Sequence, residues 1–147
     1  MTATQPLVAT QSFSHGTIEC SDMAKTRRFL GQYLGVDVVR PLPEAQYLWK
    51  GGPWSVVCVC VEGDAKIQGQ QNHFKLSVRT AAEVDDAHEA AQVHRDDFGI
   101  REITPVKEDG PFRAFRLLDQ DGSWWEVTTL NQAHYDRLFE QGDHKPA

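Results

Sequence analysis

Three side chains in this sequence of 147 residues have the chemistry and the placement to bind one divalent metal ion: His15, His73 and Glu126. Two imidazoles and a carboxylate can hold a divalent cation on one side and leave the opposite positions open for substrate, water or oxygen. The two histidines stand at matching places in two similar segments of the chain. This recurrence favours metal binding over the ordinary interpretation, a hydrogen-bonded histidine on a strand.

An internal repeat of about 60 residues positions these side chains. Each copy opens with an alternating, strand-like segment that carries the histidine, at residues 13–20 and 72–79. An N-cap signal, a helical pattern and a glycine stop follow, at Gly35 in the first copy and Gly99 in the second. Neither copy can bury a sheet face alone, so the two must pair. We therefore predict an α+β fold with two paired βαβββ modules forming a curved mixed sheet around a metal-binding cup.

The repeat also sets the expected organisation of the chain. The predicted parts are a flexible arm at 1–11, one domain at 12–130 and a C-terminal helix and tail at 131–147. Within the domain, module 1 covers about 12–65 and module 2 about 70–130. The predicted helices are 23–33, 84–98 and 132–140, and the further predicted strands are 36–39, 45–50, 54–61, 100–106, 112–118 and 123–130.

Alternation along the predicted strands places the candidate ligands on one face of each sheet. In the second opening strand the apolar residues are expected under the helix, so His73 and Lys75 share the opposite face. In the last strand the same reasoning puts Trp124 and Glu126 opposite the helix, and in the first strand it puts His15 there. If the sheets curl toward each other, these side chains can converge.

Composition limits the classes of partner. Acidic residues outnumber basic ones by 21 to 15, and the net charge of −6 argues against nucleic acid. No apolar run is long enough to span a membrane, and the start of the chain has no secretory signal pattern. Three cysteines without a framework spacing fit a reducing cytosol. We expect a cytoplasmic protein that binds a small molecule and contacts neither nucleic acid nor membrane.

The other potential ligands receive structural interpretations. Cys58 and Cys60 could form a soft metal site, but two thiols without a second pair nearby are better explained as small core residues. The remaining histidines lie in helical or terminal contexts and are predicted to be surface residues: His88, His94, His134 and His144.

The sequence resembles the vicinal oxygen chelate superfamily, which includes glyoxalase I, fosfomycin-resistance proteins, methylmalonyl-CoA epimerase, bleomycin-binding proteins and extradiol dioxygenases. The resemblance covers about residues 13–130. Its carriers are FSHGTIECSD at 13–22, RFL at 28–30 with YLG at 33–35, NHF at 72–74 and DQDGSWWE at 119–126. The last segment resembles the DPDG-x-x-x-E ending of the family, with Gln120 in place of proline.

The resemblance implies that His15, His73 and Glu126 are the metal ligands, a set similar to that of extradiol dioxygenases, which hold Fe(II). The leading prediction is an extradiol-type ring-cleaving dioxygenase for a small vicinal-diol aromatic, with Fe(II) first and Mn(II), Zn(II) or Ni(II) as alternatives. Two departures stand against it. The additional histidine of these enzymes is missing near Cys58, and Arg116 stands at the spacing of their tyrosine.

These departures imply either an altered chemistry or acid–base chemistry carried by other groups, for which Lys75 and Tyr47 are the candidates. Glyoxalase I carries a fourth ligand on the last strand of its first module, and the nearest equivalent here is Cys58. The absence of a fourth carboxylate favours an open site.

Two further functions stay open. The first is a glyoxalase- or epimerase-type lyase or isomerase, which would use a divalent metal without oxygen. The second is a non-catalytic resistance protein that binds a small molecule. The resemblance also implies a homodimer, in which the modules pair within one chain or are exchanged. In the exchanged form, His15 of one subunit joins His73 and Glu126 of the other.

Overall fold

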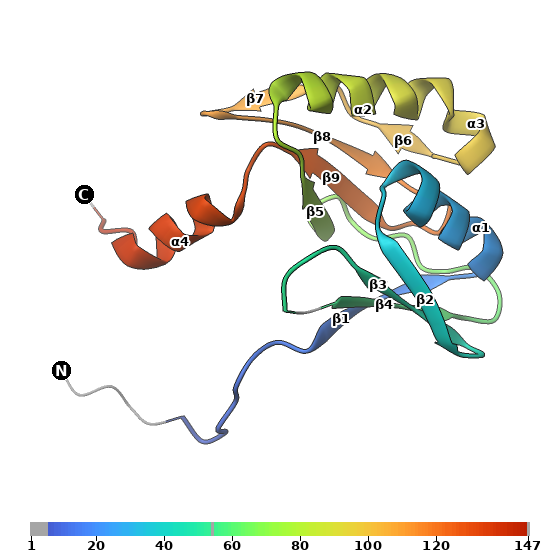
Figure 1. Ribbon diagram of the computed structural model, residues 1–147, viewed down its shortest axis with the longest axis horizontal. Helices are drawn as coiled ribbons and strands as arrows, with labels where there is room; N and C mark the ends of the chain where they lie inside the picture. Colours follow the sequence, from blue (N-terminus) through green and yellow to red (C-terminus); the bar gives the residue numbers. More distant parts are fainter. Residues whose placement is uncertain (1–5, 54, 147) are drawn as a thin grey trace.

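The computed structural model describes residues 6–53 and 55–146 and contains two β-sheets with helices packed against them (Figure 1). The first half of the chain forms sheet A and its helical segments: β1 (His15–Cys20), α1 (Met23–Arg28), η1, a π-helical turn (Phe29–Tyr33), β2 (Asp37–Leu42), β3 (Ala45–Trp49) and β4 (Ser55–Cys60). The second half forms sheet B, the helices that cover it and a closing helix: β5 (His73–Ser77), α2 (Ala81–Val93), α3 (Arg95–Phe98), β6 (Glu102–Ile103), β7 (Lys107–Asp109), β8 (Phe112–Leu118), β9 (Trp124–Thr128) and α4 (Gln132–Gln141).

The two sheets have the same topology. Sheet A has the order β1-β4-β3-β2 and sheet B has the order β5-β9-β8-β6, with β7 pairing β8 in addition. In both sheets the opening strand runs parallel to the last strand of the module, and the remaining pairs are antiparallel. The predicted α+β class and the duplication of a strand–helix–strand–strand–strand unit are confirmed.

Local sequence signals explain where the helices begin. The Asp22 carboxylate accepts a hydrogen bond from the backbone N–H of Lys25 at the start of α1, at 3.1 Å. The Thr80 hydroxyl does the same for the N–H of Glu83 at 3.2 Å and also donates to the Glu83 carboxylate, so the predicted N-cap of α2 is confirmed. Gly99 ends α3 with a positive φ of 66°, as its position after the helical pattern predicts.

Three predicted elements differ from the structure. The helix expected at 84–98 is divided at His94 into α2 and α3, and the one expected at 23–33 finishes as the η1 turn. The strand expected at 100–106 is reduced to β6, because Pro105 has no N–H to donate to a sheet. The short strand β7 has no counterpart among the predicted segments.

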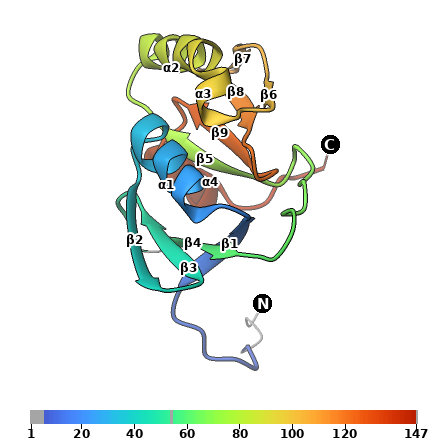
Figure 2. The ribbon, with the colours of Figure 1, turned by 90° about the vertical axis from the view of Figure 1, so that its right-hand side faces the viewer.

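One hydrophobic core connects the two modules. The helix-side residues predicted for each sheet enter it, Ile18 and Cys20 from β1 and Trp125 and Val127 from β9. Aromatic contacts join α1 and η1 to the second module, with the rings of Phe29 and Phe98 6.1 Å apart. The turned view shows α2 over sheet B and α1 on the side of sheet A that faces sheet B (Figure 2). The core therefore lies on the helix side of both sheets.

The turn between β8 and β9 fastens module 2 to module 1. The Asp121 carboxylate is buried and accepts hydrogen bonds from the Ser21 N–H at 3.2 Å and the Thr26 hydroxyl at 2.5 Å. Gly122 in the same turn has φ of 87°, and a Cβ there would lie 2.6 Å from the backbone of Ile67. This glycine is required both by its conformation and by the close approach of the segment that connects the modules.

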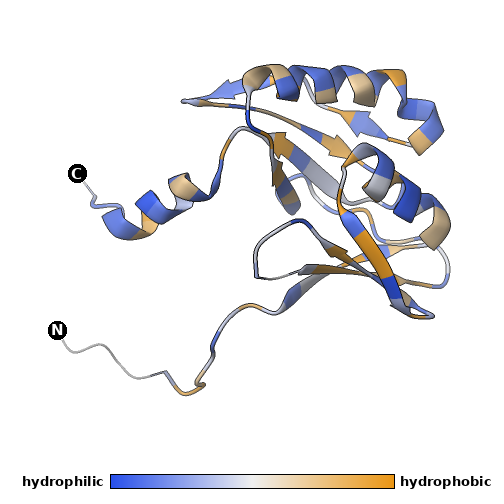
Figure 3. Cartoon of the chain, in the orientation of Figure 1, coloured by the Kyte–Doolittle hydropathy of each residue, from blue (hydrophilic) through white to orange (hydrophobic). Residues whose placement is uncertain are grey.

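The closing helix α4 extends away from the two sheets (Figure 1) and is mainly hydrophilic (Figure 3). Asn131 caps it by accepting from the His134 N–H. Within the described part of the chain, no helix combines the length and the apolar character that a membrane crossing requires.

Candidate metal and oxyanion site on sheet B

Three charged side chains form a row across the strands of sheet B. Lys75 on β5, Glu126 on β9 and Arg116 on β8 are register partners, so their side chains share one face of the sheet. Trp125 and Val127, their neighbours in sequence, point into the core on the other face. The predicted placement of Glu126 and Lys75 opposite the helix side is therefore consistent with the structure.

His73 and Glu126 lie close to each other in this face. His73 Nε2 is 3.9 Å from Glu126 Oε1, and both side chains are largely buried. His73 Nδ1 is 3.0 Å from the carbonyl oxygen of Gln70, which can only accept, so Nδ1 is the donor and Nε2 is the ring nitrogen that faces Glu126. A carbonyl that fixes the tautomer in this way is the usual support of a histidine metal ligand.

Two cations contact the Glu126 carboxylate. Arg116 Nε donates to Oε1 at 2.9 Å, and Lys75 Nζ lies 3.2 Å from Oε2. The Glu126 side chain is only 8% exposed, whereas those of Arg116 and Lys75 are 23% and 34% exposed. The cluster thus has a buried carboxylate under two partly exposed cations, and its excess charge is positive.

The segment between the modules, residues 61–72, runs along this cluster. The Gln68 N–H donates to the Gly122 carbonyl at 2.8 Å, and Trp124 Nε1 donates to the Gln68 carbonyl at 3.0 Å. Gln70 in turn contacts Arg116 Nη1 through its side-chain oxygen at 3.3 Å. These contacts bury Trp124 and hold the carbonyl that orients His73.

His15 and Tyr47 lie on sheet A, away from this cluster. His15 is exposed at the start of β1, where its register partner is Ser55. Tyr47 is half-buried on β3 and is in register with Val57, on the same face as His15. Because the core occupies the helix side of both sheets, this face and the Glu126 face both point away from it.

A single chain therefore brings together two of the three predicted ligands. His73 and Glu126 are neighbours, but among residues 6–53 and 55–146 no three His, Cys, Asp or Glu side chains are grouped so that they could hold a metal ion. The three-ligand set of His15, His73 and Glu126 stays a prediction, and it requires His15 to come from a second copy of the chain.

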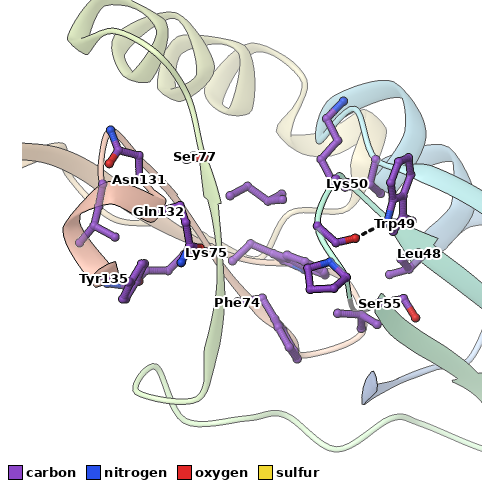
Figure 4. Close-up of a pocket in the computed structure, with 18 of the residues that line it drawn as sticks. Leu48, Trp49, Lys50, Ser55, Phe74, Lys75, Ser77, Asn131, Gln132 and Tyr135 are labelled. Carbon is purple, nitrogen blue, oxygen red and sulfur yellow. Dashed lines mark hydrogen bonds between the residues drawn. The ribbon is translucent and has the colours of Figure 1, made fainter. Parts of the chain in front are cut away.

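A cavity of about 1140 Å³ runs along β5 (Figure 4). All five consecutive residues of β5 line it, although their side chains alternate between the two faces, so the cavity follows the outer edge of the strand. Lys50 of the β3–β4 connection and Ser55 at the start of β4 line the opposite side, and Tyr135 of α4 lines the cavity beside β5. The close-up shows Lys75 and Tyr135 near each other on one side and Lys50 and Ser55 on the other.

The cysteines belong to the core rather than to this site. Cys20 and Cys58 are fully buried on the helix side of sheet A, and the hydrogen bond to Cys20 and burial raise the pKa of the Cys58 thiol. The position that matches Glu126 in the first module is Val57, which follows the register partner of His15 by two residues as Glu126 follows that of His73. The equivalence assigned to Cys58 was wrong by one residue, which reverses the face.

Two of the remaining histidines are also more enclosed than expected. His88 Nε2 donates a hydrogen bond to the Thr104 carbonyl oxygen at 3.0 Å, and its ring lies 5.0 Å from that of Phe115. His134 packs at 4.7 Å against Phe112. Both are half-buried instead of freely exposed, and both act as packing groups.

The donor set fits a divalent cation. His73 presents Nε2 toward a carboxylate oxygen, and an imidazole with a carboxylate suits the borderline and hard ions Mn²⁺, Fe²⁺ and Zn²⁺. A separation of 3.9 Å lets one ion bind both atoms at about 2.1 Å each. Arg116 opposes this fit, since its guanidinium occupies the same oxygen.

Comparison with known proteins identifies the fold. No family model matches the chain, and no curated sequence matches it. Among solved structures, the fosfomycin resistance protein FosX from Listeria monocytogenes, complexed with Mn(II) and sulfate, aligns with a TM-score of 0.67 and 19% identity over 90% of this chain and 99% of that one. FosX from Mesorhizobium loti aligns with a TM-score of 0.64 and 17% identity, covering 86% and 98%.

An integron cassette protein from the mobile metagenome of Halifax Harbour sewage outfall also aligns, with a TM-score of 0.61 and 17% identity over 82% of this chain and all of that one. The chain thus has the fold of the vicinal oxygen chelate proteins, and the resemblance seen in the sequence is confirmed at the level of the fold. At these identities the comparison carries no activity to this chain.

Proposed function

We propose that this protein is a divalent-metal-dependent enzyme that acts on a small, anionic substrate with two adjacent oxygen atoms. The observation that carries the proposal is the pairing of His73 Nε2 with the buried Glu126 carboxylate under two cations. When bound there, a divalent ion would polarise the substrate oxygens as a Lewis acid. His73 and Glu126 would hold the ion, and Lys75, the more exposed cation, would attract the substrate anion.

The positions of β1 and β5 at the edges of their sheets support a homodimer with exchanged modules. β1 and β5, which carry His15 and His73, each stand at an end of their sheets. Edge strands of this kind pair readily with another chain. The cavity along β5 leaves room for such a strand, and His15 on the β1 of a second copy would then approach His73 and Glu126. In this arrangement Tyr47 enters from the same copy as His15, where its phenol could move a proton.

Oxygen-independent chemistry is the form of this proposal that the site favours. Arg116, at the place where the family resemblance leads one to expect the tyrosine of extradiol dioxygenases, is bound to Glu126. Solved FosX structures support this choice, since one holds Mn(II) and 1S,2S-dihydroxypropylphosphonic acid, a phosphonate with two adjacent hydroxyls. The ring-cleaving dioxygenase with Fe(II) and the cytoplasmic location stay predictions.

A substrate screen with two readouts tests the proposal. Protein purified without chelators would be loaded in parallel with Mn(II) or, anaerobically, with Fe(II). We expect turnover of small phosphonate epoxides or of a hemithioacetal without oxygen uptake, and we expect Lys75→Met to raise KM more than it lowers kcat. Oxygen consumption with catechols would establish the dioxygenase alternative instead. Stoichiometric binding of a small molecule with neither metal nor turnover would indicate a binding protein.

A further inference from the structure

Arg116 occupies the carboxylate oxygen that a metal ion would need. Its Nε donates to Glu126 Oε1 at 2.9 Å, and this is the oxygen that lies nearest to His73 Nε2, at 3.9 Å. A guanidinium is charged at every accessible pH, so it cannot relieve the conflict by losing a proton. A dication placed between His73 and this oxygen would meet a fixed positive charge at close range, in a largely buried place where water screens little.

We propose that Arg116 is an internal competitor for the metal, which leaves Glu126 when the ion binds and then contacts the anionic group of the substrate. This inference rests on the proposed function and assigns Arg116 a specificity-determining task within it. Metal and anion would therefore bind with positive coupling. An anion that attracts Arg116 frees Glu126 for the metal, and by thermodynamic reciprocity the metal strengthens anion binding to the same degree.

The contacts of Arg116 allow this movement. Apart from Glu126, its guanidinium touches only Gln70 among the side-chain hydrogen bonds of the described residues, at 3.3 Å to the side-chain oxygen and 3.5 Å to the carbonyl, which are long distances. The backbone of Arg116 is fixed independently of the side chain, through its N–H to the Thr104 hydroxyl and through β8. The guanidinium can thus turn away from Glu126 while the strand stays in place.

Lys75 explains why the released arginine would find an anion. Its ammonium lies on the other oxygen of Glu126, at 3.2 Å, and its side chain is 34% exposed. With the metal on Oε1, two cations remain beside the site, and the single carboxylate is shared with the ion. An oxyanion such as a phosphonate or carboxylate offers the planar or tetrahedral oxygens that a guanidinium binds in bidentate fashion.

Arg113 provides a matched control on the same strand. It lies on the opposite face, where it pairs with Asp85 at 2.8 Å and with Glu108 at 2.5 Å, and none of the ion pairs of residues 6–53 and 55–146 joins it to the Glu126 cluster. Replacing either arginine with methionine removes one positive charge from β8. The loss of charge acts at long range in both variants, but only the change at Arg116 also removes a hydrogen-bond donor from the Glu126 carboxylate. A difference between the variants therefore reports on that contact.

The test is calorimetric titration of the metal-free full-length protein with Mn(II), with and without methylphosphonate. We expect Arg116→Met to bind Mn(II) at least tenfold more tightly than the unmodified protein in the absence of the anion, and Arg113→Met to match the unmodified protein. We expect methylphosphonate to tighten Mn(II) binding at least threefold in the unmodified protein and in Arg113→Met, and to leave Arg116→Met unchanged.

Each other outcome is decisive. Equal or weaker Mn(II) binding by Arg116→Met, or the same methylphosphonate effect in all three proteins, would overturn the inference while the proposed metal site stands. Binding by Arg116→Met alone would support the competition and overturn the proposed function of the natural chain. No Mn(II) binding by any of the proteins would overturn both. Arg116→Gln, with circular dichroism as the folding check, replaces the methionine variant if that variant does not fold.

Discussion

Sheets A and B share a strand order but differ in what they present on the face opposite the core. At the corresponding register positions sheet B carries three charged residues, and sheet A carries a hydroxyl, an aliphatic group and a phenol: Lys75, Glu126 and Arg116 against Thr17, Val57 and Tyr47. Both opening strands begin with a histidine. The duplicated scaffold therefore repeats its packing, whereas the chemistry is concentrated in the second copy.

The connecting turns differ in the same way. In sheet B the β8–β9 turn is buried, with Asp119 accepting from the N–H groups of Asp121 and Ser123 and from Trp125 Nε1, all at 2.9 Å. In sheet A the β3–β4 connection contains Gly51 and Gly52, and both are exposed. The more polar sheet is thus also the one with the more tightly specified turn, which holds β9 and Glu126 in position.

Among the predictions, the largest effect is expected on Mn(II) affinity, when Glu126 on sheet B is compared with Val57, the residue at the matching register position on sheet A. We expect Glu126→Gln to weaken Mn(II) binding at least 100-fold, because the amide gives up the anionic ligand while the two cations beside it remain. Val57→Thr, a change of similar size at the matching place in sheet A, should alter the affinity less than twofold. Titration followed by electron paramagnetic resonance of free Mn(II) measures both. Equal effects would remove the distinction between the sheets.

Replacing one glycine in the β8–β9 turn and one in the β3–β4 connection compares how much each turn contributes to the unfolding free energy. Gly122 and Gly52 both have positive φ, of 87° and 83°, but only at Gly122 would a Cβ collide with backbone, that of Ile67 at 2.6 Å. We expect Gly52→Ala to cost about 1 kcal/mol from backbone conformation alone and Gly122→Ala about 3 kcal/mol. Urea unfolding followed by tryptophan fluorescence gives both values. Similar losses would show that residues 61–72 do not pack on the turn as described.

A pH dependence of stability should come from Asp119. Burial raises the pKa of this carboxyl to about 6, in spite of its three N–H donors, so the folded protein holds a proton that the unfolded chain releases near pH 4. This contribution to the unfolding free energy is fully present below pH 4 and is lost as the pH rises through 6. It should fall by about 1 kcal/mol between pH 5 and pH 7.

Asp119→Asn provides the control for that measurement. The variant should be less stable at both pH values, since an amide has one acceptor oxygen, whereas the Asp119 carboxyl accepts hydrogen bonds at both of its oxygens. The difference in unfolding free energy between the variant and the unmodified protein should shrink toward pH 7. Denaturant titrations at the two pH values give this difference. A difference that grows with pH would show that the N–H donors outweigh burial and that the carboxyl titrates in the usual acid range.

Much of this fold follows from local sequence patterns. The histidine-bearing strands, the capping residues Asp22 and Thr80 and the strand at 112–118 could be predicted, because alternation and caps depend only on neighbouring residues. The division of the helix at His94 could not, since the helical pattern of residues 84–98 continues through that position.

For the site, sequence patterns indicated which residues face away from the core but not which sheets meet. The proximity of Arg116 to Glu126 could have been predicted from the sequence, because a hairpin with its turn at 119–122 puts the two residues opposite each other. The contribution of Gln70 was not, since it depends on the path of a connecting segment that has no strand or helix pattern of its own. Whether His15 joins the other ligands depends on a second copy of the chain.

The central claim is a metal site divided between two copies of the chain. The most direct test mixes two separate variant proteins, His15→Ala and Glu126→Gln, in equal amounts. Each variant alone should bind almost no Mn(II). After joint unfolding and refolding, mixed dimers should contain one intact site each, so the mixture should recover about one quarter of the wild-type Mn(II) content. No recovery, or full Mn(II) binding by His15→Ala alone, would contradict the account.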